Sequence, residues 1–319
     1  MSDDCESKDI HDTGQWNDHC ESQYTCTSER LWKDIHGSED IPQCLPVCGK
    51  PKHPVQQIRR IIGGDKAEAG HFSWLVYLKT RGPGGGALIS DRWILTTAHM
   101  FVFKEDSDTK KPVTNVSDVE VYMGDIDLRK QIELGLYPVE NIFVHPEFMR
   151  VDHNFDNDIA LIKLSKSVTM STDIMPICLP WKNSSQTLYE EGHLGYISGF
   201  GVTEKNSLHS HLRYVRLPTV SRDNCKDFLR GKVIDDQPPV FSDNMFCAGL
   251  SQTEKKQKDS CQGDSGGAFT VLDEEAERWV ATGIVSWGIG CGRGYGFYTK
   301  VINYRHWMEE VMKEAPPVL

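Results

Sequence analysis

The sequence of 319 residues lacks the patterns that assign a chain to several common classes of protein. No apolar run approaches the length of a membrane span, and no C-x-x-C pair indicates a zinc site. Positive charge is scarce, because 35 Lys and Arg against 46 Asp and Glu leave a formal net charge of −11. A nucleic-acid-binding protein normally carries a basic patch. The absences therefore argue against a membrane-spanning protein, a zinc protein and a nucleic-acid partner.

A signal peptide is also missing, since residues 1–20 are polar and acidic. The ten cysteines nevertheless indicate disulfides and an oxidising compartment, because their number is even and their spacing wide. Glycosylation sequons at Asn115 and Asn183 agree with secretion. We expect a secreted, extracellular protein whose export signal lies further upstream; a cytosolic protein with ten free thiols is the weaker alternative. The cysteines are at positions 5, 20, 26, 44, 48, 178, 225, 247, 261 and 291.

Composition divides the chain into three parts. Residues 1–46 are short and polar and hold four cysteines, so that they could not form a stable core without disulfides. Residues 47–60 form a proline-containing, stiff connector. Residues 61–319 contain short β-type runs separated by Gly, Asp, Asn and Pro, which predicts an all-β barrel or sandwich. Only the end, from about Tyr304 to Glu314, is expected to be helical. The clearest predicted strands are 74–78, 93–97, 159–164 and 279–285.

The segment 259–267, Asp-Ser-Cys-Gln-Gly-Asp-Ser-Gly-Gly, carries the strongest chemical signal. Ser265 lies among glycines that permit a tight turn, and such a turn could aim the NH groups of Gly263 and Ser265 at one point. That arrangement stabilises an oxyanion in acyl transfer. A serine hydroxyl is a weak nucleophile without a base, so the segment predicts chemistry only if a base lies nearby.

A base and an orienting acid are available elsewhere in the chain. His99 follows the predicted strand 93–97 and could take the serine proton, although eleven other histidines mean that position alone does not select it. Asp158 precedes the apolar run that begins at Ile159, so its carboxylate would be buried and would need a partner such as an imidazole NH. Asp156 is the competing acid, and we expect it to be solvated.

His99, Asp158 and Ser265, in this order and each in its local motif, resemble the triad of the trypsin/chymotrypsin-like serine proteases. The resemblance covers residues 61–319 and includes the start, Arg60-Ile-Ile-Gly-Gly64, and Ser286-Trp-Gly288 near the end. It implies two six-stranded antiparallel β-barrels with the triad in the cleft between them and a C-terminal helix. It also implies that Ser265 attacks a peptide carbonyl to form an acyl-enzyme.

The resemblance also implies how the substrate is selected. Asp259 would lie at the base of the primary specificity pocket and favour Arg or Lys. Gly288 and Gly296 would form the pocket walls, and Ser286 and Gly288 would pair with the substrate backbone. No cofactor is required for catalysis. Tyr295 resembles a residue of proteases that bind Na+ near this pocket; the simpler alternative is that Tyr295 only packs.

The family further implies control by cleavage. If the bond Arg60–Ile61 is cut, the new ammonium of Ile61 can pair with Asp264 and so hold Gly263 and Ser265 in the oxyanion-binding arrangement. Before the cut the carboxylate lacks this partner. We therefore expect the chain to be a zymogen.

The cysteines fit the family with one departure. The resemblance implies the disulfides Cys48–Cys178, Cys225–Cys247 and Cys261–Cys291. Many relatives have a further disulfide beside the triad histidine, but here its two positions are Met100 and, by alignment, Gly84. That absence is a feature of the complement-initiating proteases.

Residues 1–46 support the same group, since they resemble the end of a complement control protein (sushi) module. The chain resembles subcomponents r and s of the first complement component, and r is favoured. In the partial module Cys5 is expected to pair with Cys44, and Cys20 could pair with Cys26, but four cysteines allow three connectivities. Calcium would bind only to modules further upstream.

The sequence therefore predicts a secreted endopeptidase that cuts after Arg or Lys. Its partners would be complement zymogens as substrates, serpin-type inhibitors and other subunits of a complement initiation complex. A non-catalytic scaffold that binds complement partners is an alternative, although such proteins usually lose a triad residue. A digestive trypsin is disfavoured by the sushi-like segment.

Overall fold

The computed structural model describes the backbone of two short strands near the N-terminus and most of the chain from residue 48 onward. The strands β1 (Thr25–Cys26) and β2 (Trp32–Lys33) pair antiparallel. The rest of the expected sushi-type module lies outside the described residues. The described ranges beyond these strands are 48–55, 65–102, 114–148, 154–180, 187–201, 208–234, 237–250, 264–289 and 294–314.

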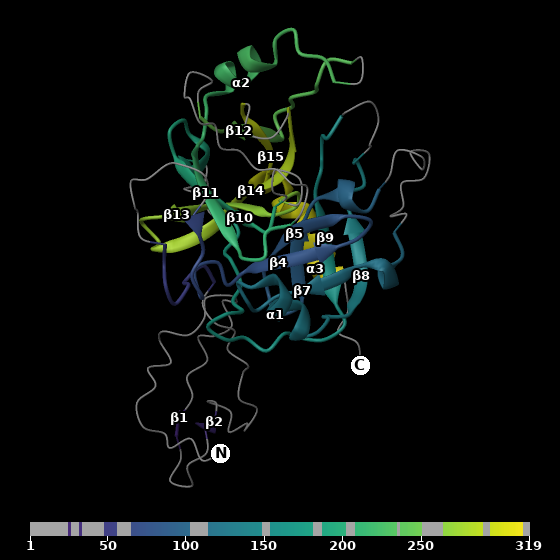
Figure 1. Ribbon diagram of the computed structural model, residues 1–319, viewed down its shortest axis with the longest axis vertical. Coiled ribbons are helices and arrows are strands. Elements are labelled where there is room, and N and C mark those ends of the chain that lie inside the picture. Colours follow the sequence, from purple (N-terminus) through teal and green to yellow (C-terminus); the bar gives the residue numbers. More distant parts are fainter. Residues whose placement is uncertain are drawn as a thin grey trace.

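Two antiparallel sheets form the main body, and Figure 1 shows them one above the other. The first sheet has six strands in the order β7-β4-β5-β6-β9-β8. Its central strands are buried apolar runs such as Trp-Ile-Leu-Thr and Ala-Leu-Ile-Lys-Leu, which suit a strand covered on both faces. The strands are β4 (Leu75–Lys79), β5 (Pro83–Leu88), β6 (Trp93–Thr96), β7 (Glu120–Tyr122), β8 (Val139–Val144) and β9 (Ala160–Leu164).

The second sheet has seven strands, in the order β12-β15-β14-β13-β10-β11-β3. The expected number was six; the seventh is the exposed two-residue strand β3, which pairs with β11 and has no apolar pattern that could have predicted it. The strands are β3 (Asp65–Lys66), β10 (Leu194–Gly199), β11 (Arg213–Pro218), β12 (Met245–Ala248), β13 (Ala268–Asp273), β14 (Arg278–Gly288) and β15 (Gly296–Lys300). The all-β chymotrypsin-like architecture is confirmed.

The C-terminal helix is present as predicted: the 3-10 turn η6 (Val301–Tyr304) leads into α3 (Arg305–Glu314), which buries Met308. The expectation that only this end is helical was wrong. Two short helices, α1 (Leu128–Glu133) and α2 (Arg222–Leu229), also form. Their N-caps, Asp127 and Ser221, accept hydrogen bonds from the first backbone NH groups of each helix. Both helices are short and largely polar, with apolar residues at helical spacing for only about one turn each: Leu128 and Ile132 in α1, and Cys225, Phe228 and Leu229 in α2. Such a short pattern was not recognised in the sequence.

Apolar clusters hold the two sheets together. One lies within the first sheet, one within the second, and the largest joins the two. Trp279 packs on Trp74 and Tyr196 in that joint cluster, with ring centroids 6.2 and 5.0 Å apart. The packing brings β5 of the first sheet against the beginning of β13 in the second, which is where the candidate active site lies.

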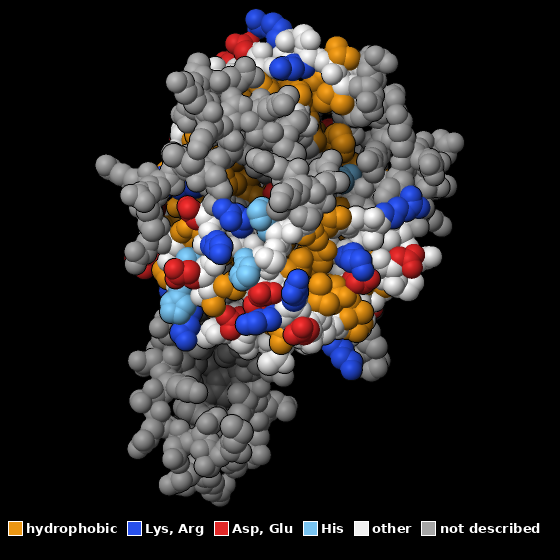
Figure 2. Space-filling view, in the orientation of Figure 1, with side chains coloured by type: hydrophobic (Ala, Val, Ile, Leu, Met, Phe, Trp, Pro, Cys, Tyr) orange, Lys and Arg blue, Asp and Glu red, His pale blue; other side chains and the backbone are white. Residues whose placement is uncertain are grey.

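The connector is attached to the second sheet. Cys48 forms a disulfide with Cys178, Gly49 NH donates to the Pro176 carbonyl at 2.9 Å, and Trp279 NH donates to the Gly49 carbonyl at 2.9 Å. Among the described residues, no helix is long and apolar enough to cross a membrane. On the face shown in Figure 2, acidic and basic side chains are interspersed rather than gathered into a patch of one sign.

Candidate active site

His99 and Asp158 meet at the end of two paired strands. His99 lies in the 3-10 turn η2 (Ala98–Met100) directly after β6, and Asp158 lies just before β9. The pairing Thr96↔Ala160 sets both residues at the same end of the first sheet. His99 Nδ1 is 2.8 Å from Asp158 Oδ2, and His99 NH donates to Asp158 Oδ1 at 2.8 Å. A carboxylate only accepts, so Nδ1 carries the proton and Nε2 becomes the nitrogen that can take one.

Asp158 is fully buried, and further hydroxyl groups satisfy it. Ser286 Oγ in β14 donates to Asp158 Oδ2 at 2.5 Å, and Thr299 Oγ1 in β15 donates to the Asp158 carbonyl at 2.9 Å. Both donors come from the second sheet. The buried charge is thus compensated by groups from both halves of the molecule, as a buried carboxylate requires.

The residues before Asp158 are held by side chains from distant parts of the chain. Asn157 has a left-handed backbone (φ 59°), which is uncommon for a residue other than glycine. Its Oδ1 accepts from Tyr304 OH at 3.1 Å and from Asn244 Nδ2 at 3.3 Å. Asp156 Oδ1 accepts from Ser242 Oγ at 2.5 Å and from Asn244 Nδ2 at 3.2 Å. The expectation that Asp156 is solvated was therefore wrong, because it is half-buried and anchors this loop.

Ser265 lies in a turn that leads into β13 and contacts the first sheet. Its carbonyl accepts from Gly85 NH in β5 at 2.7 Å, and the Gly85 carbonyl accepts from Thr96 Oγ1 at 2.9 Å. Gly266 has φ 84°, in the region that favours glycine, and its NH donates to the Val285 carbonyl at 2.9 Å. The turn is thereby tied to β5 and to β14, and through Thr96 to the strand that precedes His99.

The Asp264 carboxylate points into a space bounded by two glycines. Gly201 NH donates to Asp264 Oδ1 at 3.2 Å. A Cβ on Gly201 would lie 2.8 Å from Oδ2, and one on Gly199 would overlap Oδ1. The approach of Asp264 therefore depends on glycine at both positions. Ile61, its expected ammonium partner, lies outside the described residues.

The Trypsin family profile matches residues 61–308. The chain belongs to the trypsin family. Over 91% of its length it is 48% identical to the complement C1r-B subcomponent of Mus musculus and 46% identical to the C1r-A subcomponent of the same species. Over 92% it is 42% identical to the complement C1r subcomponent-like protein of Homo sapiens. The chain covers 39% of each of the two mouse C1r proteins and 60% of the human one. The predicted likeness to a trypsin-like protease close to subcomponent r is confirmed.

In this trypsin-family chain, β14 and β15 form the described part of the expected specificity pocket. Their pairing continues to Gly288↔Gly296, whereas the pairing of β14 with β13 ends at Ile284. Gly288 is exposed, and a Cβ added to it would meet no atom of the described residues within 4 Å. Tyr295 packs on Phe228 of α2 with ring centroids 5.1 Å apart.

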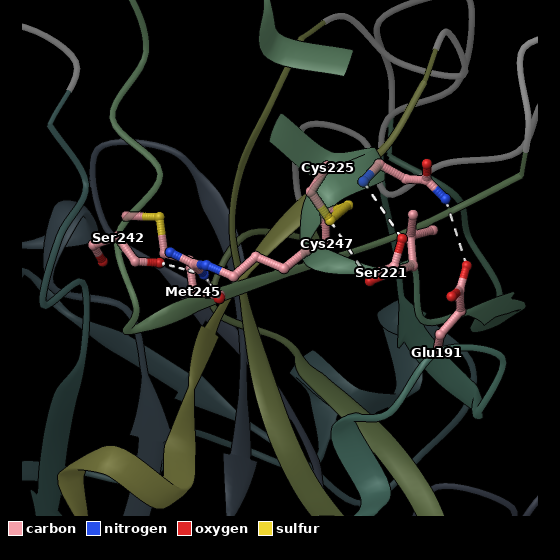
Figure 3. Close-up of a disulfide and its surroundings, with 9 residues drawn as sticks. Glu191, Ser221, Cys225, Ser242, Met245 and Cys247 are labelled. Carbon is pink, nitrogen blue, oxygen red and sulfur yellow. Dashed lines mark hydrogen bonds between the residues drawn. A yellow bond between two sulfur atoms is a disulfide. The ribbon is translucent and has the colours of Figure 1, made fainter. Parts of the chain in front are cut away.

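Helix α2, whose Phe228 packs on Tyr295, is held in place by a disulfide and by hydrogen bonds, which Figure 3 shows. The disulfide Cys225–Cys247 joins α2 to β12. Arg222 Nη1 donates to the Ser242 carbonyl at 3.0 Å, and the Arg222 guanidinium lies over the Phe241 ring, 4.6 Å from its centroid. The helix that carries Phe228 is thus fixed both covalently and through hydrogen bonds.

Several predicted site residues lie outside the described residues, so their places in the site stay predictions. Asn115, by contrast, is described and exposed. Among the described residues, no group of three or more His, Cys, Asp or Glu side chains could hold a metal ion. The predicted residues outside the description are Arg60, Ile61, Asn183, Asp259, Gly263, the pair Cys261–Cys291, and Cys5, Cys20 and Cys44.

The aromatic side chains near His99 were not predicted from the sequence. Phe155 packs edge-on against the His99 ring at 5.8 Å and stacks with Trp287 at 6.4 Å. Trp287 in turn stacks on Phe297 at 4.0 Å. Phe155 lies three residues before Asp158, and this short separation in the sequence could have indicated that its ring lies near His99. Thr299 and Asn157 were also missed, because their partners are more than 80 residues away.

Proposed function

We propose that the chain is a secreted serine endopeptidase that cuts after Arg or Lys in complement-type protein substrates. The proposal is supported chiefly by one observation: in a trypsin-family domain, Gly85 of β5 links the Ser265 turn to Thr96, three residues before His99, and His99 is hydrogen-bonded to Asp158. A scaffold that had lost catalysis would have no need to retain all three groups.

In the proposed reaction, His99 Nε2 takes the proton of Ser265 Oγ while that oxygen bonds to the substrate carbonyl carbon. The carbonyl oxygen becomes an oxyanion, which the NH groups of Gly263 and Ser265 stabilise. His99 then gives its proton to the leaving amine as the peptide bond breaks. Water attacks the resulting acyl-enzyme in the same way, which releases the acid and restores Ser265. Asp158 holds the His99 ring and stabilises its transient charge.

Substrate preference would come from Asp259, whose carboxylate pairs with an Arg or Lys side chain between Gly288 and Gly296. The open side of β14 near Ser286 and Gly288 would add the substrate backbone as a strand. Cleavage at Arg60–Ile61 would free the ammonium that pairs with Asp264 and orders Gly263. The glycine-lined space around Asp264 supports this step, because it lets other groups approach the carboxylate closely.

The decisive test is titration of the protein, after cleavage at Arg60, with a phosphonate ester that carries an arginine-like side chain. We expect one serine to be labelled per chain, and we expect Ser265→Ala and His99→Ala to abolish labelling. An arginine ester should be hydrolysed at least 100-fold faster than a phenylalanine ester. The absence of labelling in the cleaved chain would favour the non-catalytic scaffold. An Arg60→Gln protein that still gained full activity on exposure to the activating protease would refute the zymogen step.

Further proposals concern partners and surroundings. The natural substrates would be complement zymogens, the inhibitors would be serpins, and other initiation-complex subunits would bind upstream modules. The relatives' names support a complement role. Exposed Asn115 would carry a glycan in a secreted chain. A Na+ ion near Tyr295 is also proposed, and equal activity in sodium chloride and choline chloride would contradict it.

A further inference from the structure

The side chain of Met100 fills a space beside a glycine of the strand that supports the Ser265 turn. Met100 directly follows His99, is 7% exposed and belongs to the apolar cluster of the first sheet. A Cβ added to Gly84 in β5 would overlap Met100 Cε and lie 2.6 Å from Met100 Sδ. The same Cβ would lie 3.1 Å from the Ser265 carbonyl oxygen. The thioether therefore packs on β5 at the point where β5 carries the Ser265 turn.

Met100 also lies close to Thr96 of β6 and to Gly266 of the turn. Its Sδ lies 3.8 Å from Thr96 Oγ1, and a Cβ added to Gly266 would lie 3.3 Å from Sδ. Thr96 Oγ1 donates to the Gly85 carbonyl, and Gly85 NH donates to the Ser265 carbonyl at 2.7 Å. One side chain thus lies beside the strand before His99, the strand β5 and the glycine that follows Ser265.

We propose that Met100 is a positioning residue for the nucleophile: its thioether holds the Ser265–Gly266 turn against β5 and so keeps Ser265 in register with His99. The glycines on both sides give the turn and β5 little stiffness of their own. A displacement of about 1 Å at a reacting group can cost about 100-fold in rate. The kinetic part of this inference rests on the proposed function, because Met100 acts through Ser265 and does not touch substrate.

The test compares two truncations of the same size in the same apolar cluster. Met123 is 1% exposed and belongs to the cluster of Met100. The described contacts of the Ser265–Gly266 turn are with Met100, Gly85, Thr96 and Val285. Met100→Ala and Met123→Ala should lower the melting temperature by similar amounts. Measured well below both melting temperatures on a small arginine ester, only Met100→Ala should lower kcat, by about tenfold or more, with KM changed less than twofold. Equal kcat values in the two variants would overturn the proposal.

Variants that refill the space of the Met100 side chain show whether its volume or its sulfur atom is needed. Met100→Leu keeps most of the side-chain volume and should retain at least a third of the wild-type kcat. The double variant G84C/M100C removes the long side chain and places two thiols at these positions. Its oxidised form should exceed Met100→Ala in kcat by at least fivefold, while Met100→Cys alone should not. If Met100→Leu were as slow as Met100→Ala, steric support of the turn would be wrong, whether or not the disulfide forms.

A readout without catalysis keeps this inference distinct from the proposed function. Hydrogen exchange at Gly85 NH reports its bond to the Ser265 carbonyl directly. We expect exchange in Met100→Ala to be at least tenfold faster than in wild type and in Met123→Ala. If wild type failed to react with the phosphonate, the proposed function would fall and the exchange experiment would still decide on Met100. Equal exchange rates in the three proteins would refute the positioning role.

Discussion

At the scale of single residues, most contacts of the site converge on the buried carboxylate of Asp158. Two groups donate to its Oδ2: His99 Nδ1 at 2.8 Å and Ser286 Oγ at 2.5 Å. Thr299 holds its carbonyl, and Asn157 before it keeps a left-handed backbone. Removal of one donor leaves the buried carboxylate with one hydrogen bond fewer, which makes its charge less favourable.

Ser286→Ala is therefore expected to lower kcat/KM for an arginine ester by about 10- to 100-fold. A hydrogen bond to a charged group contributes about 1.5–3 kcal/mol, and 1.4 kcal/mol corresponds to a factor of about ten in rate. Steady-state kinetics measures the effect. Thr282→Val is the matched control, because Thr282 lies in the same strand and its hydroxyl donates to the Phe269 carbonyl instead. A control as slow as Ser286→Ala would show that the loss is a general effect on β14.

The apolar strand after Asp158 predicted that its carboxylate is buried, whereas His99 was selected only through the resemblance to the trypsin-like proteases. The sequence did not predict the surroundings of Asn157, whose partners Asn244 and Tyr304 are 87 and 147 residues away. Contacts of this kind depend on how two sheets pack, and no local pattern encodes that. Asp156 was misjudged for the same reason, since Ser242 and Asn244, which lie just before β12, are 86 and 88 residues away.

At the scale of elements, α2 is held by its N-cap and by its disulfide to β12. Cys225 and Cys247 are 22 residues apart, and closing a loop of this length contributes about 3 kcal/mol to stability. We expect Cys225→Ala/Cys247→Ala to lower the free energy of unfolding by about 2–4 kcal/mol, measured with urea without reductant. Ser221→Ala, which removes the N-cap, should cost only about 1 kcal/mol. A double variant that lost less than the cap variant would contradict this account.

Helix α3 contacts His145, which follows β8. The His145 ring lies 5.1 Å from the rings of both Tyr304 and Trp307. Burial lowers the pKa of His145 below its usual value near 6.5, while the carboxylates of Glu147 and Asp156 act to raise it. The folded state therefore binds the proton less readily than the unfolded chain, so stability decreases as the pH falls through about 6.5.

His145→Phe keeps an aromatic ring against α3 and removes this titration. Its melting temperature should fall less than that of wild type between pH 7 and pH 5, as thermal unfolding at the two values would show. Part of the pH dependence should remain, because burial also lowers the pKa of His71 and of His209. The variant His306→Asn, at an exposed position on α3, measures the general effect of losing a histidine. If the melting temperature of His145→Phe fell between pH 7 and pH 5 by as much as that of wild type, His145 would not contribute to the pH dependence of stability.

At the scale of the whole molecule, the two-sheet architecture followed from the sequence because the central strands are continuous apolar runs. Trp93–Thr96 and Ala160–Leu164 are buried throughout and admit few other interpretations. The polar elements could not be predicted in this way. Both residues of strand β3 and half of the residues of helix α2 are exposed, and their positions follow from neighbours in the folded molecule rather than from their own composition.

Cleavage after Arg60 would divide the chain into pieces of 60 and 259 residues. Because Cys48 and Cys178 lie on opposite sides of this bond, the two pieces should migrate as one band on a non-reducing gel and as two after reduction. The two pieces of the cleaved variant Cys48→Ala/Cys178→Ala should separate on the gel without reductant. Cys225→Ala/Cys247→Ala is the control, since both its positions follow the cut and its pieces should stay joined. If the pieces of the cleaved control separated without reductant, the disulfide Cys48–Cys178 would not be the bond that joins them.

Strand β14 connects the attachment point of the connector to the buried carboxylate of Asp158. At its beginning, Trp279 is hydrogen-bonded to Gly49, next to the disulfide of Cys48; seven residues later, Ser286 supports Asp158. These two points are about 23 Å apart along an extended strand, and a strand resists stretching along its axis. We therefore expect a pull on the residues upstream of Cys48 to reach the buried carboxylate of Asp158 along β14.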